Sequence, residues 1–549
     1  MKIALAQQDY HIGNFEENGR KIIEAVRKAK ANGVDLILFP ELAVCGYPPR
    51  DFLEFKDFIR LCDEVIAAIA KETHGIGVIV GSPAINPVIE GKDLFNSAYF
   101  LLNGKIERVV NKALLPTYDV FDEYRYFEPG RDFSVIEFKG KKIALTVCED
   151  LWNVGNENPM YVTCPMDVLT GQRPDLIANI SASPFDYHHA ADRIHVLKAN
   201  TARYNAPVFY VNHVGAQTEL IFDGGSLVLD ANGRVVEELP YFEEAYREYD
   251  FDDLANPNHI GKPDNVQPKE KIALIHDALV LGIKDYFRKL GFKKAILGLS
   301  GGIDSALVTV LAARALGPKN VWPIMLPSQY SSDHSVSDSE KLCQNLGIKV
   351  DKIAIEEPFQ AFLKALEPQF KDLPFGIAEE NIQARTRAVI LMALSNKFGH
   401  ILLNTSNKSE AAVGYGTLYG DMCGGISVIG DLYKTEAYQL AEYINRHGEV
   451  IPRNIITKPP SAELRPNQKD SDSLPEYDIL DQVLYQYIEH RKGPDEIIAM
   501  GFDEALVKRV LRLVNINEYK RYQTPPILRI SPKAFGMGRR MPIVGKYLG

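Results

Sequence analysis

The sequence lacks the features that mark zinc-binding, secreted and membrane-spanning proteins. Its six cysteines form no CxxC pair, and its twelve histidines show no zinc-ligand spacing. No apolar run reaches the roughly 18 to 20 residues that a membrane-spanning helix needs. The chain opens on MKIALAQQDY, which reads as a strand rather than as a signal peptide. We therefore expect a cytoplasmic chain with free thiols, no structural metal and no membrane partner.

Clustered positive charge is also missing. Lysine and arginine number 62 against 72 aspartates and glutamates, for a formal net charge of −10, and no basic run is long enough to suggest a nucleic-acid arm. We expect no nucleic-acid partner. The 549 residues exceed the roughly 250 to 300 that one hydrophobic core supports, so two domains are the default.

Local patterns divide the chain into residues 1–250, a linker at 251–270 and residues 271–549. The first part alternates strands and helices and has hairpin turns at Asn103-Gly104, in FKGKK and at Asn232-Gly233, which predicts a mixed sheet covered by helices. The linker is rich in Asp, Asn and Pro and has no period. The last part has a β-α-β rhythm, which predicts an α/β fold with a doubly wound parallel sheet.

A glycine-rich string, LGLSGGIDSALV, joins a strand to a helix at the start of the third part. Gly301 and Gly302 allow backbone N–H groups to converge at a helix N-terminus, which suits a phosphate. The GxxxxGK[ST] spacing of a Walker A loop is absent. Asp304 beside a phosphate implies a bridging Mg²⁺. A tight turn with a helix cap is the alternative, and the full Ser-Gly-Gly-x-Asp-Ser string favours the phosphate site.

The string SGGIDS resembles the pyrophosphate loop of the ATP pyrophosphatases. Three more strings, NIQARTR, LNTSNKSE and PPSAELRP, narrow the resemblance to the NAD synthetases, and the tail NEYKRYQTPPILRISPKAFGMGRRMPI resembles the long, glutamine-dependent members. The resemblance implies an adenine nucleotide alpha hydrolase-like fold for residues 271–549. It also implies an ATP site formed by Gly298, Leu299, Ser300, Gly301, Gly302, Ile303, Asp304, Ser305, Thr405, Lys434 and Ser461.

The same resemblance implies sites for the metal and the second substrate. Asp304 and Glu410 would hold Mg²⁺. The residues placed at the dinucleotide, deamido-NAD, are Asn381, Arg385, Glu410, Asp421 and Lys520. Where short members of the family have threonine, this chain has Ser461.

Cys148, in KKIALTVCEDLW, ends an apolar strand. A cysteine in this position is either a buried structural thiol or a nucleophile. A nucleophile needs a proton acceptor and a partner for the oxyanion, and Glu41 and Lys112 also follow apolar runs. Three strands can therefore deliver all three side chains to one edge of a sheet, and this is the arrangement we expect.

Glu41 in FPEL, Lys112 in NKALLP and Cys148 in TVCEDLW resemble the nitrilase superfamily. That resemblance implies an αββα domain over residues 1–250 in which Cys148 attacks a carboxamide, Glu41 transfers protons and Lys112 stabilises the oxyanion. It also implies that Tyr118 and Ser183 contact the substrate glutamine.

One position departs from the nitrilase pattern. Six residues after Ser183, where the family commonly has lysine or arginine, this chain has His189. His189 or nearby Arg193 would then receive the α-carboxylate of glutamine. Glu149 is expected to support the site rather than act as its base.

Together the resemblances imply that ammonia from glutamine amidates deamido-NAD through an ATP-derived acyl-adenylate, with release of AMP and pyrophosphate. A sheltered ammonia path and a homo-oligomer, an octamer among the alternatives, are expected. Other glutamine-dependent ligases and tRNA-thiolating enzymes share the ATP loop, although the net charge argues against the latter. A nitrilase-fold binding module without catalysis is an alternative of another class.

Overall fold

The computed structural model describes residues 1–154, 160–255, 264–266, 269–371, 373–466 and 468–547. The chain divides into two compact units, Met1–Lys269 and Glu270–Gly549. Much of the predicted linker lies outside the described residues. Its first residues form α5 (Phe251–Leu254), whose Phe251 and Leu254 are buried in the core of the first unit.

The first unit contains two mixed six-stranded sheets. One has the order β14-β1-β2-β3-β4-β5 and the other β13-β12-β9-β8-β7-β6. The strands of the first sheet are β1 (Lys2–Gln7), β2 (Leu36–Leu38), β3 (Gly77–Ile85), β4 (Leu94–Leu102), β5 (Lys105–Asn111) and β14 (Ala245–Asp250). Those of the second are β6 (Ile136–Phe138), β7 (Lys141–Val147), β8 (Leu176–Ser181), β9 (Val208–Asn212), β12 (Leu227–Leu229) and β13 (Val235–Glu238). A separate hairpin pairs β10 (Val214–Gln217) with β11 (Leu220–Asp223).

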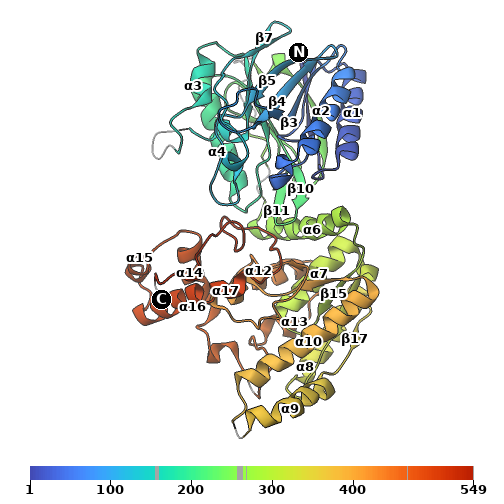
Figure 1. The fold of residues 1–549 in the computed structure, drawn as a ribbon, viewed down its shortest axis with the longest axis vertical. Coiled ribbons are helices and arrows are strands. Elements are labelled where there is room, and N and C mark those ends of the chain that lie inside the picture. Colours follow the sequence, from blue (N-terminus) through green and yellow to red (C-terminus); the bar gives the residue numbers. More distant parts are fainter. Residues whose placement is uncertain (155–159, 256–263, 267–268, 372, 467, 548–549) are drawn as a thin grey trace. The chain divides into compact units, whose positions relative to one another are not determined.

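Helices cover the outer face of each sheet (Figure 1). Helices α1 (Phe15–Ala31) and α2 (Lys56–Lys71) pack on the first sheet, and α3 (Pro165–Thr170) and α4 (His189–Tyr204) on the second. A third apolar cluster fills the space between the sheets. Both faces of the central strands are thus buried, which explains their continuous Val, Ile and Leu runs. The predicted αββα fold is confirmed, as are the three predicted hairpin turns.

The second unit is built on a five-stranded sheet of order β17-β16-β15-β18-β19, in which every pair is parallel. Its strands are β15 (Ala295–Gly298), β16 (Val321–Met325), β17 (Asp351–Lys352), β18 (Ile401–Asn404) and β19 (Ile426–Ser427). The doubly wound prediction is confirmed. The strand order reverses between β15 and β18, and ligands of such sheets bind at the carboxyl ends of the strands beside that point.

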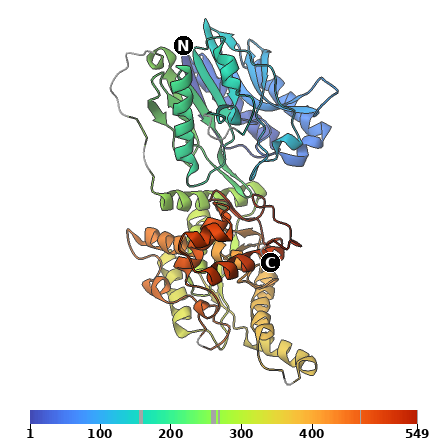
Figure 2. The ribbon, with the colours of Figure 1, turned by 90° about the vertical axis from the view of Figure 1, so that its left-hand side faces the viewer.

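Among the helices near that crevice are α7 (Ile303–Leu316), α8 (Asp333–Leu346), α10 (Ile377–Phe398), α11 (Lys408–Val413) and α12 (Lys434–Asn445). The others are α6 (Lys271–Leu290), α9 (Glu356–Phe370), α13 (Arg453–Thr457), α14 (Tyr477–Ile488), α15 (Pro494–Ala499), α16 (Glu504–Ile516) and α17 (Glu518–Arg521). Helices α14 to α16 share one apolar cluster with α11 and appear in red tones in Figure 2. Among the described residues, no helix is long and apolar enough to cross a membrane.

Candidate active sites

The first candidate site lies in the first unit, where three strands end. Glu41 follows β2, Lys112 follows β5 and Cys148 follows β7. The expected single sheet edge is wrong: β2 and β5 belong to the first sheet and β7 to the second, and the three strand ends meet because the two sheets pack face to face. Their exposed fractions are 0%, 1% and 5%. Lys112 Nζ donates to Glu41 Oε1 at 2.7 Å. The charges of Glu41 and Lys112 both act on the Cys148 thiol, so the structure brings the three predicted side chains together.

The Glu41 carboxylate is held on both oxygens. Oε1 also accepts from Asn96 Nδ2 at 2.6 Å, and Oε2 accepts from the backbone N–H of Ala182 at 2.8 Å. The backbone of Glu41 lies directly against Gly81 of β3, where a Cβ would come within 2.7 Å of Glu41 Cα and 2.2 Å of Leu42 N. A fixed carboxylate is suited to repeated proton transfer because its geometry does not change between steps.

A second buried carboxylate, Glu123, completes the charge cluster and was not predicted. Lys112 Nζ donates to Glu123 Oε1 at 2.8 Å, and the Tyr47 hydroxyl donates to the same oxygen at 2.8 Å. Burial raises the pKa of Glu123 to about 7. Burial opposes charge on Lys112, but Glu123 and Glu41 outweigh it and raise the pKa of its ammonium. Glu123 lies in a stretch that mixes aromatic and charged residues, YDVFDEYRYF, without strand or helix period, so nothing in the sequence marked it as a site residue.

Cys148 adopts a left-handed backbone conformation, with φ of 43°. It opens a short 3₁₀ helix, Cys148–Leu151, at the end of β7. Asp150 fixes this turn: its carboxylate accepts from Val147 N at 3.1 Å and from Ala113 N and Leu114 N at 3.0 and 2.9 Å. Burial, followed by the negative charge of Glu41, raises the pKa of the Cys148 thiol, and Lys112 opposes this rise. The resting cysteine is therefore a protonated thiol.

Two of the residues that were predicted to bind the substrate glutamine contact one another. Ser183 Oγ and His189 Nε2 are 2.6 Å apart. The His189 ring also stacks on Trp152, with centroids 4.8 Å apart and planes 10° apart. Arg193, the alternative to His189, is 1% exposed and its guanidinium pairs with Asp223 at 2.6 Å. Its charge is already matched by a carboxylate.

The third residue predicted to bind glutamine is Tyr118. Its hydroxyl donates a hydrogen bond to Glu149 Oε1 at 3.0 Å. Tyr161, which was not predicted, donates to the same oxygen at 3.1 Å. Burial raises the pKa of Glu149. The carboxylate next to the cysteine is thus held by two tyrosines, and Glu41 rather than Glu149 bonds to Lys112.

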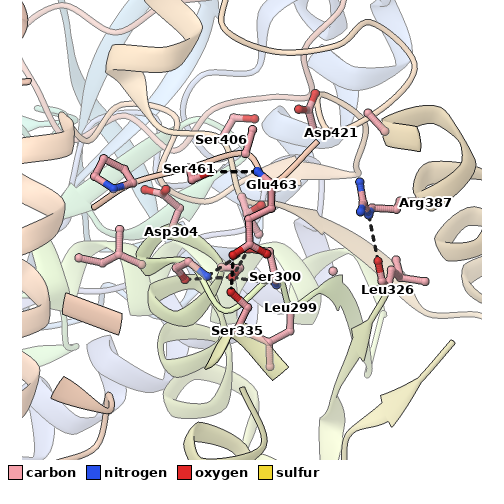
Figure 3. A pocket seen from close by; sticks show the side chains of 18 of the residues that line it. Leu299, Ser300, Asp304, Leu326, Ser335, Arg387, Ser406, Asp421, Ser461 and Glu463 are labelled. Atoms are coloured by element: carbon pink, nitrogen blue, oxygen red, sulfur yellow. Dashed lines mark hydrogen bonds between the residues drawn. The ribbon is translucent and has the colours of Figure 1, made fainter. Parts of the chain in front are cut away.

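The second candidate site is a cavity of about 310 Å³ in the second unit. Segments that follow β15, β16 and β18 line it, which places it at the strand-order reversal (Figure 3). The predicted residues that line it are Gly298, Leu299, Ser300, Gly302, Ile303, Asp304, Ser305, Thr405, Glu410, Asp421, Lys434 and Ser461. Gly301 lies behind this surface with φ of 80°, and a Cβ there would come within 2.4 Å of Ser335 O.

The two predicted metal ligands converge on one ammonium group. Lys434 Nζ is 2.5 Å from Asp304 Oδ2 and 3.3 Å from Glu410 Oε1. Burial raises the pKa of Glu410 to about 8. The carboxylate oxygens of Asp304 and Glu410 thus lie near the same position. Carboxylate oxygens are suitable ligands for Mg²⁺, whose other ligands are waters and phosphate oxygens. No group of three or more His, Cys, Asp or Glu in the described chain is arranged to hold a metal alone.

Three predicted dinucleotide residues are not among the residues that line the cavity. Asn381, Arg385 and Lys520 instead bond to the 414–421 segment, which ends at the cavity residue Asp421. Arg385 Nε donates to Leu418 O at 3.1 Å, and Lys520 Nζ donates to two carbonyls of the segment at 2.7 and 2.9 Å. Asn381 Oδ1 accepts from a threonine hydroxyl of the same segment at 2.8 Å.

Other polar residues of the cavity were not predicted. Glu463 Oε1 accepts from Ser332 Oγ at 2.9 Å and Ser335 Oγ at 2.7 Å, at the start of α8. Lys458 Nζ donates to Ser335 Oγ at 3.0 Å. The string PPSAELRP pointed to this loop, but single positions within it could not be ranked. Arg387, in NIQARTR, also lines the cavity.

Comparisons with known proteins agree with this division of the chain. Residues 2–256 match the carbon-nitrogen hydrolase family and residues 275–524 the NAD synthase family. A glutamine-dependent NAD(+) synthetase of Synechocystis is 44% identical over 98% of each chain. One from Thermotoga maritima is 40% identical over 100% of this chain and 99% of its own.

A solved structure supports the same assignment over the whole fold. The glutamine-dependent NAD+ synthetase of Acinetobacter baumannii, solved in complex with ADP, is 38% identical and superposes with a TM-score of 0.77. The match covers 100% of this chain and 99% of that one. The resemblance inferred from the motifs is confirmed: this chain belongs to the family of glutamine-dependent NAD(+) synthetases.

Proposed function

We propose that the chain performs its family's reaction at the two sites described above. Glutamine is hydrolysed at Glu41, Lys112 and Cys148, and the ammonia amidates deamido-NAD in the cavity beside Asp304. The observation that carries this proposal is that one chain holds a buried Glu-Lys-Cys cluster in one unit and a nucleotide-sized cavity with a glycine loop in the other.

The glutaminase half follows from the positions of its charges. As Cys148 Sγ forms a bond to the carboxamide carbon, the thiol proton passes to Glu41 and the carbonyl oxygen becomes an oxyanion facing Lys112. The carbonyl then re-forms, the C–N bond breaks and ammonia leaves with the proton that Glu41 held. Water attacks the thioester, Glu41 takes its proton, and the C–S bond breaks to give glutamate and the thiol.

Because the pKa of the Cys148 thiol is raised, the proton leaves sulfur as the substrate binds and reacts, not before. Lys112 keeps its charge through its two carboxylate partners and so remains a donor to the oxyanion. An ammonium in a buried site stabilises such an oxyanion more strongly than it would in water.

Glutamine is held, in this proposal, by Tyr118, Ser183 and His189. Arg193 is paired with Asp223, which favours His189 as the donor to the α-carboxylate. The stacked Trp152 ring fixes the plane of the imidazole. Replacing His189 by arginine is then expected to lower the KM for glutamine and leave ammonia-dependent synthesis unchanged.

The synthetase half uses the cavity of the second unit. The glycine loop, Thr405, Lys434 and Ser461 bind ATP, while Asn381, Arg385, Glu410, Asp421 and Lys520 form or support the dinucleotide site. Asp304 and Glu410 hold Mg²⁺, which offsets the negative charge of the phosphates when it is bound. Lys434, between these carboxylates, is placed to donate to a phosphate oxygen.

The chemistry of this half has two steps. The substrate carboxylate attacks the α-phosphorus of ATP, the α–β P–O bond breaks and pyrophosphate leaves. Ammonia then attacks the acyl carbon, the bond to the AMP oxygen breaks and the nitrogen loses a proton. Backbone N–H groups of the glycine loop receive the leaving pyrophosphate.

One assay tests the proposal as a whole. Purified chain is incubated with ATP, Mg²⁺, deamido-NAD and glutamine. Equal amounts of NAD, AMP, pyrophosphate and glutamate are expected. Glutamate without NAD, or ADP and phosphate in place of AMP and pyrophosphate, would contradict it. A homo-oligomer and a cytoplasmic location stay predictions of the sequence, and light scattering of the purified chain tests the first.

A further inference from the structure

One charged side chain of the cavity has so far been given no role. Helix α10 presents Ala384, Arg387, Ala388 and Leu391 to the cavity, at the i, i+3, i+4 and i+7 spacing of a single helix face. Arg387 is the one charged member of this stripe. In Figure 3, Arg387 and Asp304 lie on opposite sides of the cavity.

Most N–H donors of the Arg387 guanidinium have no hydrogen-bond acceptor among the described residues. Arg387 Nε donates to Leu326 O at 3.0 Å, which anchors the base of the fork at the end of β16. Within the described residues, its four terminal N–H groups meet no protein acceptor. The two carboxylates whose charges act on it are Asp421 and Glu463. Both already accept other hydrogen bonds, from a backbone N–H at 2.6 Å and from the serines at the start of α8.

The charge of Arg387 persists in this half-buried setting. Burial lowers the pKa of its guanidinium to about 10, and Asp421 and Glu463 oppose the fall. At neutral pH the cavity therefore contains a positive charge with open donors. Such a group is costly unless a ligand supplies the acceptors.

The charges of the two reacting groups indicate which group of the ligand accepts hydrogen bonds from Arg387. The substrate carboxylate must approach the α-phosphate of ATP, so two anions meet. The phosphate side has its own cation, Lys434, next to Asp304, and the backbone N–H groups of the glycine loop. The opposite side, where Arg387 lies, has no such assignment. A guanidinium fork matches a carboxylate in two parallel hydrogen bonds.

We propose that Arg387 binds the reacting nicotinate carboxylate of deamido-NAD and so distinguishes this substrate from the product. This inference rests on the proposed function. The product has a neutral carboxamide in place of the carboxylate, so the charge-assisted part of the contact is lost when the reaction is complete. Arg387 thus favours substrate entry over product retention.

The test is a comparison of two ligands in the full chain. In Arg387→Gln, affinity for deamido-NAD is expected to fall at least tenfold, while affinity for NAD changes less than twofold. Arg387→Lys, which retains the charge but not the fork, should recover part of the discrimination. The KM for ATP in ammonia-dependent synthesis should stay within about twofold. Arg453→Gln, at an exposed arginine paired with Glu442, is the matched control.

The outcomes separate the possibilities. Equal loss of affinity for deamido-NAD and NAD would show a structural role and overturn the proposal, as would a rise in the KM for ATP as large as that for deamido-NAD. If the unmodified chain made no NAD, the proposed function itself would fail. If it made NAD and Arg387→Gln kept full discrimination, only this inference would fail.

Discussion

At the scale of single residues, the glutaminase site depends on how closely the backbone around Glu41 is packed. Gly81 leaves no room for a side chain, since a Cβ would come within 2.2 Å of Leu42 N. Such a contact with backbone atoms is relieved only if the strand or the Glu41 turn moves. Glu41, the proposed base, is then displaced from Lys112 and Cys148.

Gly81→Ala is therefore expected to lower glutamine-dependent synthesis at least tenfold and to leave ammonia-dependent synthesis within about twofold. Both rates are measured in the same preparation. Gly19→Ala is the control, because its Cβ meets only the two Val65 methyls, at 3.2 and 3.7 Å, where α1 packs against α2. An unchanged glutamine-dependent rate in Gly81→Ala would show that the position of Glu41 is less critical than we infer.

The second residue-scale prediction concerns Glu123. Burial raises the pKa of its carboxyl from 4.5 to about 7, so in this pH range the folded chain binds a proton that the unfolded chain has released. The free energy of unfolding of the first unit therefore falls as pH rises through this window, by about 3 kcal/mol for 2.5 pKa units. Glu123→Gln does not titrate, so its stability relative to the unmodified chain should improve by about this amount between pH 5 and 8.

The two tryptophans make this measurement specific, because Trp152 lies in the first unit and Trp322 in the second. Denaturant unfolding in a Trp322→Phe background follows the first unit alone. Glu107→Gln, at an exposed glutamate of β5, is the control and should show no such trend. A stability difference that stays constant with pH would contradict the raised pKa of Glu123.

Part of the site around Glu41 could be predicted from the sequence, and part could not, for a physical reason. Glu41, Lys112 and Cys148 each follow an apolar strand, and strand ends are visible in a sequence. Glu123 has no such signal, because a loop of mixed aromatic and charged residues has the same sequence pattern whether its glutamate is buried or exposed. The catalytic roles of Glu41, Lys112 and Cys148 stay predictions of the sequence.

At the scale of elements, Asp150 joins the end of β7 to the segment that follows β5. Its carboxylate accepts from three backbone N–H groups, one at Val147 and two directly after Lys112. The positions of Cys148 and Lys112 are thus coupled through one side chain. Burial raises the pKa of Asp150 to about 6, and the three N–H donors favour its ionised form at neutral pH.

Asp150→Asn replaces one acceptor oxygen by an N–H donor, so at least one of these hydrogen bonds is lost. We expect glutamine-dependent synthesis to fall at least tenfold and ammonia-dependent synthesis to stay within about twofold. Asp132→Asn, at an exposed carboxylate paired with Arg108, is the control. If the two nitrogen donors were affected alike in Asp150→Asn, Asp150 would support the fold rather than the site.

For one strand, the sequence pattern predicts a longer element than the structure has. The apolar stretch IKVDKIAI predicts a full strand, yet only Asp351–Lys352 pairs with β16. It lies at the edge of the sheet, where a single neighbour limits pairing. The central strands β15 (AILG) and β16 (VWPIM) lie within the strands that KKAILGLS and NVWPIMLPS predict, because nearly all their residues are apolar and buried.

At the scale of the whole molecule, each unit holds one candidate site, and in the proposed function ammonia made at one is consumed at the other. Free ammonia is protonated at neutral pH and ammonium is not a nucleophile, so the sequence predicts a sheltered transfer. With glutamine labelled with ¹⁵N at its amide and an excess of unlabelled ammonium, NAD is expected to retain the label. Complete dilution of the label into the buffer pool would contradict a sheltered path.

The division of labour between the units is the central claim, and two variants assayed with two nitrogen donors test it most directly. Cys148→Ala should make NAD from ammonia at nearly the unmodified rate and none from glutamine. Asp304→Asn should lose most synthesis with either donor, because it alters the cavity where both routes meet, yet still release glutamate from glutamine. Equal loss with both donors in Cys148→Ala, or full ammonia-dependent synthesis in Asp304→Asn, would contradict the account.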